Sequence, residues 1–187
     1  MAMRRLQDVE RDELKDFLGK GWLTHDGMWF YHTYLDSGME KANRLNREAI
    51  RSLAAVEIAR ARKVLRIDED DLRSFEGLQL FMSDALEMIL PKSVFSQAGF
   101  TFIPPNLFHW EWKDGECFAY KGMRQLGVLD EYTCGVTFRI ECWLENLGIP
   151  YTVEPKIEKC IMHETGHCRG DFTIYFEGAS LLPGGPG

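Results

Sequence analysis

The sequence has no apolar run long enough to cross a membrane. Spanning a bilayer takes about 20 consecutive, mostly apolar residues, and no stretch of this 187-residue chain approaches that length. The N-terminus carries Arg4 and Arg5 but then turns acidic and amphipathic, without the continuous apolar segment of a secretory signal. We therefore expect a soluble, cytoplasmic protein that does not bind membranes.

Clustered positive charge is also missing. The formal net charge is -7, and residues 67–187 hold 9 Lys and Arg against 19 Asp and Glu, whereas residues 1–66 hold 13 against 10. Nucleic-acid binding depends on clustered Lys and Arg that neutralise phosphates. We therefore expect no nucleic-acid partner.

Several well-known catalytic and metal motifs are absent. The chain has no glycine-rich phosphate loop, no G-x-S-x-G elbow, no H-E-x-x-H and no paired C-x-x-C. Its cysteines number five, an odd count in a chain expected in a reducing compartment. We therefore expect free thiols or metal ligands, and not disulfides, at Cys117, Cys134, Cys142, Cys160 and Cys168.

Helical patterns fill the first half of the chain, whose length suits one domain with one core. Apolar residues recur at helical spacing over residues 8–18, 26–36 and 40–65, with Thr24 as a cap and Gly38 as a stop. A fourth apolar stripe follows Asp70 and Asp71, and Pro91 ends it. Residues 1–91 are therefore predicted to form a helical layer.

The second half alternates apolar and polar residues in the manner of strands, around Phe100 and Phe102 and again at Phe108, Trp110 and Trp112. Two helices are predicted at 118–126 and 132–147, each followed by a glycine. Residues 151–162 and 167–176 bracket a Glu-Thr-Gly turn, which predicts a hairpin. We expect one α+β domain: the helical layer packs on an antiparallel sheet within a cysteine-bearing part at 92–178, and a mobile tail follows at 179–187.

Cysteines near two predicted helix starts are candidates for chemistry. A helix N-terminus favours a thiolate, which makes Cys117 and Cys134 candidate catalytic residues. If they converge with Cys168 and His109, the four side chains would suit zinc, either structural or catalytic. The alternative is a set of separate buried thiols, since Cys is among the most buried residue types. In the predicted hairpin, Cys160 would pair with Gly170.

The helical half offers further candidates. His25, Trp29 and His32 lie along one side of a helix, so both imidazoles are candidate ligand-binding groups. Glu57 sits among apolar neighbours at helical spacing. A buried carboxylate needs a partner, so Glu57 either reaches solvent, pairs with an Arg or His of another helix, or is a catalytic or ligand-binding residue.

The C-terminal half resembles the L-2-amino-thiazoline-4-carboxylic acid hydrolase-like family, in an uncharacterised bacterial branch, and more distantly the four-vinyl-reductase-type ligand-binding domains. The residues that carry the resemblance are Cys117-Phe118-Ala119-Tyr120, Gly127, Cys134-Gly135 and the run from Cys168 to Phe176. His25-Asp26-Gly27-Met28-Trp29-Phe30 and the long helix after it also look like an uncharacterised bacterial family. The chain departs from the hydrolase-like pattern at Phe118, in place of Pro, and after Gly135, where an Asp is missing. The resemblance implies an α+β domain around a pocket, with Cys117, Cys134 and Cys168 in its wall.

These observations lead us to expect a small-molecule-binding protein. Its pocket would be edged by the three cysteines and lined by large aromatics, a common lining of such sites: Phe108, Trp110, Trp112 and Phe172. The alternative is a hydrolase of a small cyclic amide or amidine that uses a zinc-bound water or a Cys thiolate, with a His or Glu as general base. A purely structural partner protein is a third interpretation, and association into homo-oligomers stays open.

Overall fold

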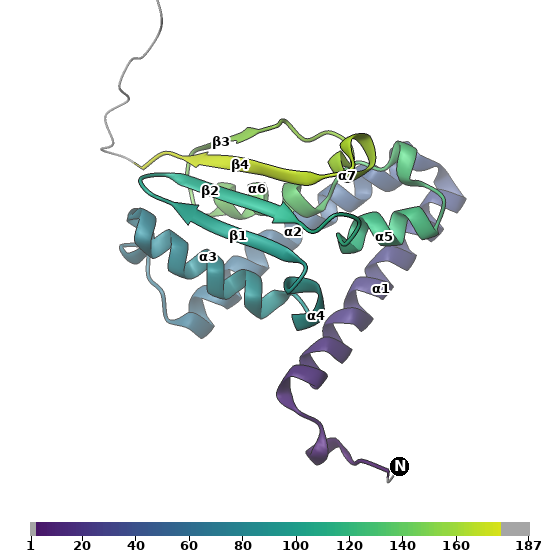
Figure 1. Cartoon of the computed structure of the whole chain (residues 1–187), viewed down its shortest axis with the longest axis horizontal. Coiled ribbons are helices and arrows are strands. Elements are labelled where there is room, and N and C mark those ends of the chain that lie inside the picture. Colours follow the sequence, from purple (N-terminus) through teal and green to yellow (C-terminus); the bar gives the residue numbers. More distant parts are fainter. Residues whose placement is uncertain (1–2, 177–187) are drawn as a thin grey trace, which may run out of the picture.

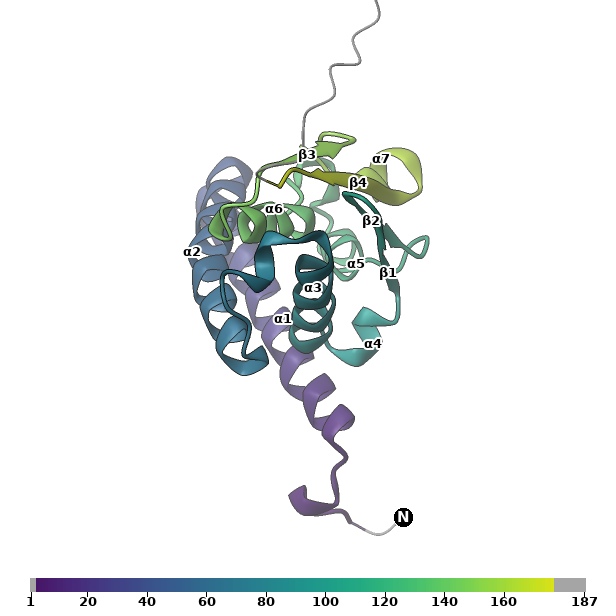
Figure 2. The same ribbon diagram turned by 90° about the vertical axis from the view of Figure 1, so that its left-hand side faces the viewer.

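Helices and strands occupy separate layers in the structure, a computed structural model that describes residues 3–176. Four antiparallel strands form one sheet, and the long helices lie against one of its faces (Figures 1 and 2). This arrangement confirms the expected α+β class. The helices are α1 (Arg11–Ser37), α2 (Met39–Leu65), α3 (Phe75–Ile89), α4 (Lys92–Phe95), α5 (Phe118–Gln125), α6 (Val136–Asn146) and α7 (Ile161–Thr165). Short 3-10 turns occur at Leu6–Asp8, Asp71–Arg73 and Leu129–Glu131.

The first helix is longer than its sequence pattern indicates. Instead of two helices, α1 runs unbroken to Ser37 and ends at Gly38, whose φ of 81° only glycine adopts readily. A glycine inside a helix costs about 1 kcal/mol relative to alanine. Packing explains why the helix nevertheless includes Gly19, because a Cβ there would lie 2.8 Å from Cγ of Pro91. The prediction of a break was wrong because tertiary contact outweighs local propensity.

The next two helices match their predicted positions. The α2 helix confirms the helix that was predicted from the apolar spacing of residues 40–65. The α3 helix begins at Ser74, whose side chain accepts a hydrogen bond from Gly77 N at 3.1 Å, and it stops just before Pro91. The proline rule therefore located the end of α3, whereas its start lies at the Ser74 cap and not directly after Asp71, because Asp71–Arg73 form a separate 3-10 turn.

The sheet has the strand order β1-β2-β4-β3, built from β1 (Ala98–Ile103), β2 (Leu107–Trp112), β4 (Cys168–Ile174) and β3 (Tyr151–Glu154). Side chains on a strand alternate between faces. On β2 the residues Phe108, Trp110 and Trp112 are therefore buried toward the helices, whereas His109 and Glu111 lie on the opposite face.

The C-terminal strands pair as expected, but not through a tight turn. β3 pairs with β4 in a register that places Tyr151 opposite Ile174, and the short helix α7 lies between the two strands along the chain. Gly170 therefore faces Trp110 of β2 and not Cys160, so the predicted register was wrong. The physical reason is that Ile161–Thr165 closes a helical turn, which Gly166 ends with a φ of 85°. The tail at 179–187, which we expected to be mobile, lies outside the described residues.

A glycine on β4 gives Trp110 the room to lie across the sheet. A Cβ on Gly170 would lie 2.6 Å from the Glu154 carbonyl oxygen and closer still to the Trp110 ring. Trp110 then packs on Phe172, with ring centroids 5.0 Å apart. One connected cluster of buried residues runs from Phe30 in α1 to Ile174 in β4, so the helices and the sheet share a core.

We predict that Gly170→Ala lowers the free energy of unfolding by about 1–3 kcal/mol, because overpacking displaces the Trp110 ring. Gly99→Ala on β1 is the matched control, since its nearest neighbour would be the Glu111 carbonyl oxygen at 3.8 Å. Urea unfolding of both variants measures the difference. Equal stabilities would contradict the close contact at Gly170.

Candidate functional site

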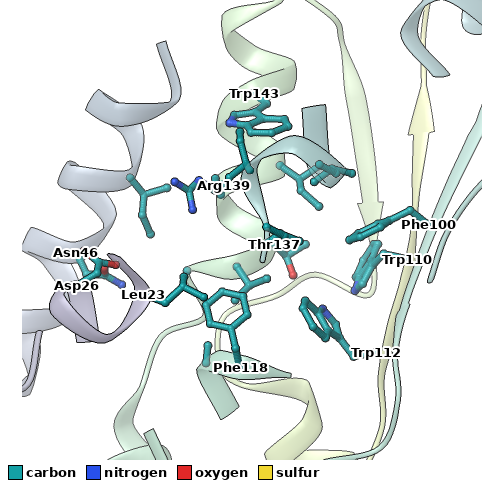
Figure 3. A pocket seen from close by; sticks show the side chains of 18 of the residues that line it. Leu23, Asp26, Asn46, Phe100, Trp110, Trp112, Phe118, Thr137, Arg139 and Trp143 are labelled. Atoms are coloured by element: carbon teal, nitrogen blue, oxygen red, sulfur yellow. The ribbon is translucent and has the colours of Figure 1, made fainter. Parts of the chain in front are cut away.

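A cavity opens between the helices and the inner face of the sheet (Figure 3). Measured over the positions that the centre of a water molecule can occupy, its volume is about 90 Å³. Its walls come from α1, α2, α3, α5, α6, β1 and β2, and six of the lining residues are aromatic: Phe100, Trp110, Trp112, Phe118, Tyr132 and Trp143. A mainly apolar and aromatic lining of this kind is common in small-molecule sites.

Three hydrogen-bonding groups converge at the deep end of this cavity. The Thr137 hydroxyl points toward the indole nitrogens of Trp110 and Trp112 (Figure 3). Trp110 is only 1% exposed, and its Nε1 has no hydrogen-bond partner among the described residues. The Cys168 thiol lies near it, but a thiol sulfur is a weak acceptor. A buried donor without a partner costs about 1–3 kcal/mol, so this N–H needs an acceptor.

The N-terminus of α6 forms the adjacent wall. Its first helical hydrogen bond runs from Arg139 N to Gly135 O at 3.1 Å, so the N–H groups of residues 136–138 have no acceptor within the helix. Gly135 lets this end approach α2, since a Cβ there would lie 2.7 Å from Cδ1 of Ile50. The partial positive charge of a helix N-terminus favours anions.

A carboxylate bridge holds α6 against α2. Glu57 accepts hydrogen bonds from Arg139 Nε and from Trp143 Nε1, each at 2.9 Å, and the second arm of the Arg139 guanidinium bonds its other oxygen. The side chains of Glu57 and Arg139 are 11% and 20% exposed. Arg139 and Trp143 line the cavity, but Glu57 does not. The Glu–Arg pairing expected from the sequence is confirmed, and the catalytic assignment of Glu57 is not supported.

Two polar side chains lie together at one side of the cavity, Asp26 from α1 and Asn46 from α2 (Figure 3). Asp26 keeps a large part of its surface exposed, and partial desolvation raises its pKa, although the Arg139 guanidinium partly offsets this effect. Asp26 is the only carboxylic acid in the cavity lining.

The cysteines lie behind the cavity wall and not in it. None of the five is among the lining residues, although Cys117 precedes Phe118 and Cys134 precedes Gly135. Cys117 does cap α5, but burial raises the pKa of its thiol despite the nearby backbone N–H groups, and burial raises the pKa of Cys168 to about 12. Desolvation therefore outweighs the helix dipole, and the expectation of a Cys117 thiolate was wrong.

The four predicted zinc ligands do not form a site. His109 lies on the outer face of the sheet, where its Nδ1 is 2.8 Å from Oδ1 of Asp171, whereas Cys168 is buried on the inner face. Within residues 3–176, no group of three or more His, Cys, Asp or Glu side chains is arranged to hold a metal ion. The prediction failed because strand alternation separates His109 from the thiols. His163 and His167 instead contact Asp130 and Asp114.

Other predicted ligand contacts are also corrected. His25 and His32 are exposed on α1 and do not line the cavity. Phe108 and Phe172 are fully buried and stack at 5.7 Å, behind the lining residues. Trp110 and Trp112 are the two predicted aromatics that do line it.

Sequence reasoning did not identify the polar lining residues Asp26, Asn46, Thr137 and Arg139. A signal existed for two of them. Asn46 shares a helical stripe with Glu57, and Thr137 follows the Cys134-Gly135 pair two residues later. Nothing in the sequence indicates that these positions meet across three helices.

Comparison with known proteins gives one match. A family model described as a family of unknown function (DUF6125) matches residues 7–99, just under half of the chain. This range spans α1 to α4 and the start of β1, so it includes Asp26 and Asn46 of the cavity lining but not Thr137 and Arg139. No curated protein and no solved structure matches the chain.

We predict that Glu57→Ala lowers the free energy of unfolding by about 2–4 kcal/mol, since it leaves Arg139 and Trp143 without their acceptor. Glu69→Ala, which removes an exposed carboxylate near Arg62, is the control and costs less than about 1 kcal/mol. Chemical denaturation compares the two. A Glu57 variant as stable as the control would contradict the bridge.

Proposed function

We propose that this protein binds a small, mainly apolar molecule that carries a hydrogen-bond acceptor, with the acceptor at the deep end of the cavity. The observation that carries the proposal is the buried Trp110 N–H, whose neighbouring acceptor within residues 3–176 is the weakly accepting sulfur of Cys168. A ligand oxygen between the Trp110 N–H, the Trp112 N–H and the Thr137 hydroxyl would satisfy it. Aromatic walls would then cover the apolar body of the ligand.

A carboxylate is the acceptor that this end of the cavity favours. The free N–H groups at the start of α6 and the Trp110 indole are all donors, and the helix end carries partial positive charge. At the other side, the Asp26 carboxyl suits a donor group such as an amine or amidine. A planar acid with a nitrogen donor at its far end fits both requirements.

We predict that benzoate or indole-3-acetate binds and changes the tryptophan fluorescence of the protein, because three tryptophans line the cavity. Thr137→Val weakens this binding about tenfold, through loss of one hydrogen bond worth about 1.4 kcal/mol. Thr101→Val, on the exposed face of β1, is the matched control and leaves the affinity unchanged.

Benzyl alcohol tests the preference for an acid, and we expect it to bind more weakly than benzoate. If neither acid changes the fluorescence or the melting temperature, the binding proposal fails. Equal affinities for benzoate and benzyl alcohol would contradict only the proposed preference for a carboxylate and would leave the binding proposal intact.

The second candidate is a hydrolase of a small cyclic amidine, the activity implied by the resemblance to the L-2-amino-thiazoline-4-carboxylic acid hydrolase-like family. The observation in its favour is Asp26, a cavity carboxyl with a raised pKa. Such a group suits general-base catalysis. It would take a proton from a water that adds to the amidine carbon, after which a ring bond breaks and the leaving atom is protonated. Cysteine nucleophiles do not fit this candidate, since no thiol lines the cavity.

For this candidate we predict that 2-amino-thiazoline-4-carboxylate is hydrolysed and that Asp26→Asn lowers kcat at least about a hundredfold. A base acts when deprotonated, so the rate falls as pH decreases through the raised pKa of Asp26. Asp70→Asn, at an exposed position, keeps full activity. Binding without turnover at any pH would reject the hydrolase and leave the binding proposal intact.

The cellular location of the protein and its lack of membrane and nucleic-acid partners remain predictions. Among the described residues, no helix is both long and apolar enough to span a membrane. A cytoplasmic location and the lack of a nucleic-acid partner are proposals that the charge distribution supports.

A further inference from the structure

The exposed face of α1 is unusually apolar. Phe17, Trp22 and Trp29 are 75%, 52% and 66% exposed. They lie with four exposed aliphatic residues along one side of the helix, at spacings of three or four residues: Leu14, Leu18, Met28 and Leu35. This α1 face, as we call these seven residues, also includes the exposed His25 and His32.

The α1 face is large enough for a stable interface. An aromatic side chain has about 150–250 Å² of surface, so the three aromatics alone expose roughly 400 Å². The four aliphatic residues bring the exposed apolar area to roughly 800 Å², above the few hundred Å² usual for a monomer. Both ribbon views show the N-terminal half of α1 extending away from the layered body (Figures 1 and 2).

Charges at the two ends of α1 indicate which partner fits. Arg11 and Asp36 lie on the same side of the helix as Trp29, and neither forms an ion pair within residues 3–176. They are about 37 Å apart, the rise of 25 helical residues. A second α1 laid antiparallel along the first would place Arg11 beside the partner's Asp36, and the reverse pair would form at the other end. A parallel arrangement would bring like charges together.

The same antiparallel register brings three of the seven residues against this face of the partner. With the two-fold axis between residues 23 and 24, Leu18 meets the partner's Trp29 and Trp22 meets the partner's His25. Gly21 lies on this face near the axis, and a Cβ there would meet nothing within 4 Å. A glycine at this place allows two helices to approach closely. Such an approach explains why the helix includes a glycine here despite the cost of glycine in helix propensity.

We propose that two copies of this chain form a symmetric dimer through antiparallel pairing of their α1 faces. The pairing is isologous, as in most homodimers. It covers Trp22 and Trp29 and gives Arg11 and Asp36 their partners. It also assigns a role to His25, Trp29 and His32, which share one side of the helix but lie outside the cavity. The proposal does not depend on what the cavity binds.

The test is the mass of the full chain in solution, measured by light scattering or sedimentation at micromolar concentration. We expect twice the 21.6 kDa chain mass for the wild type and a single-chain mass for Trp29→Glu. Leu80→Glu is the matched control, because Leu80 of α3 is 65% exposed but lies off the α1 face, and it stays dimeric. Far-UV circular dichroism checks that each variant is folded.

Charge exchange tests the antiparallel register. Arg11→Glu and Asp36→Arg each weaken the dimer about fivefold, and the two together restore it, since each removes or restores two exposed ion pairs. A single-chain mass for the wild type, or a dimer unaffected by Trp29→Glu, would overturn the proposal. So would a monomer that binds anionic phospholipid vesicles through this face, or charge variants without mutual rescue.

Discussion

The bridge between Glu57 on α2 and Arg139 with Trp143 on α6 is the interaction on which the cavity depends. Two donors and one carboxylate, all largely removed from water, fix the axial and rotational position of α6. A partly satisfied buried network is costly, so each member restrains the other two. The position of α6 in turn sets where its N-terminus and Thr137 lie relative to the sheet.

The sheet forms the cavity wall opposite α6, and close packing fixes the position of this wall too. Trp110 can lie flat across β4 only because Gly170 has no side chain, and Phe172 then supports the indole from one side. This packing leaves the buried indole N–H beside the weakly accepting sulfur of Cys168. The N-terminus of α6 and the inner face of the sheet thus both contribute hydrogen-bond donors around the cavity. This convergence of donors distinguishes the cavity from an ordinary packing gap.

Two surfaces of α1 have different roles in these proposals. The inner side carries Phe30 into the core and Asp26 to the cavity, whereas the outer side exposes aromatics. Because the helix is rigid and continuous, a partner bound along the outer side would also restrain the position of Asp26.

The sequence alone determined the elements whose signals are local. Apolar periodicity located α2, alternation located β1 and β2, and glycine or proline marked most helix ends, because these depend on neighbours a few residues apart. The need of Glu57 for an arginine or histidine partner also followed from its apolar neighbours on one helix.

Only the tertiary structure decided the rest. It selected Arg139 as the partner of Glu57, joined two expected helices through contact of Gly19 with Pro91, and replaced a tight hairpin by α7. It also separated His109 from the cysteines, placed the thiols behind the wall, and brought Asp26, Asn46 and Thr137 together. The physical reason is that burial, desolvation and close approach depend on residues far apart in the chain, which no local pattern records.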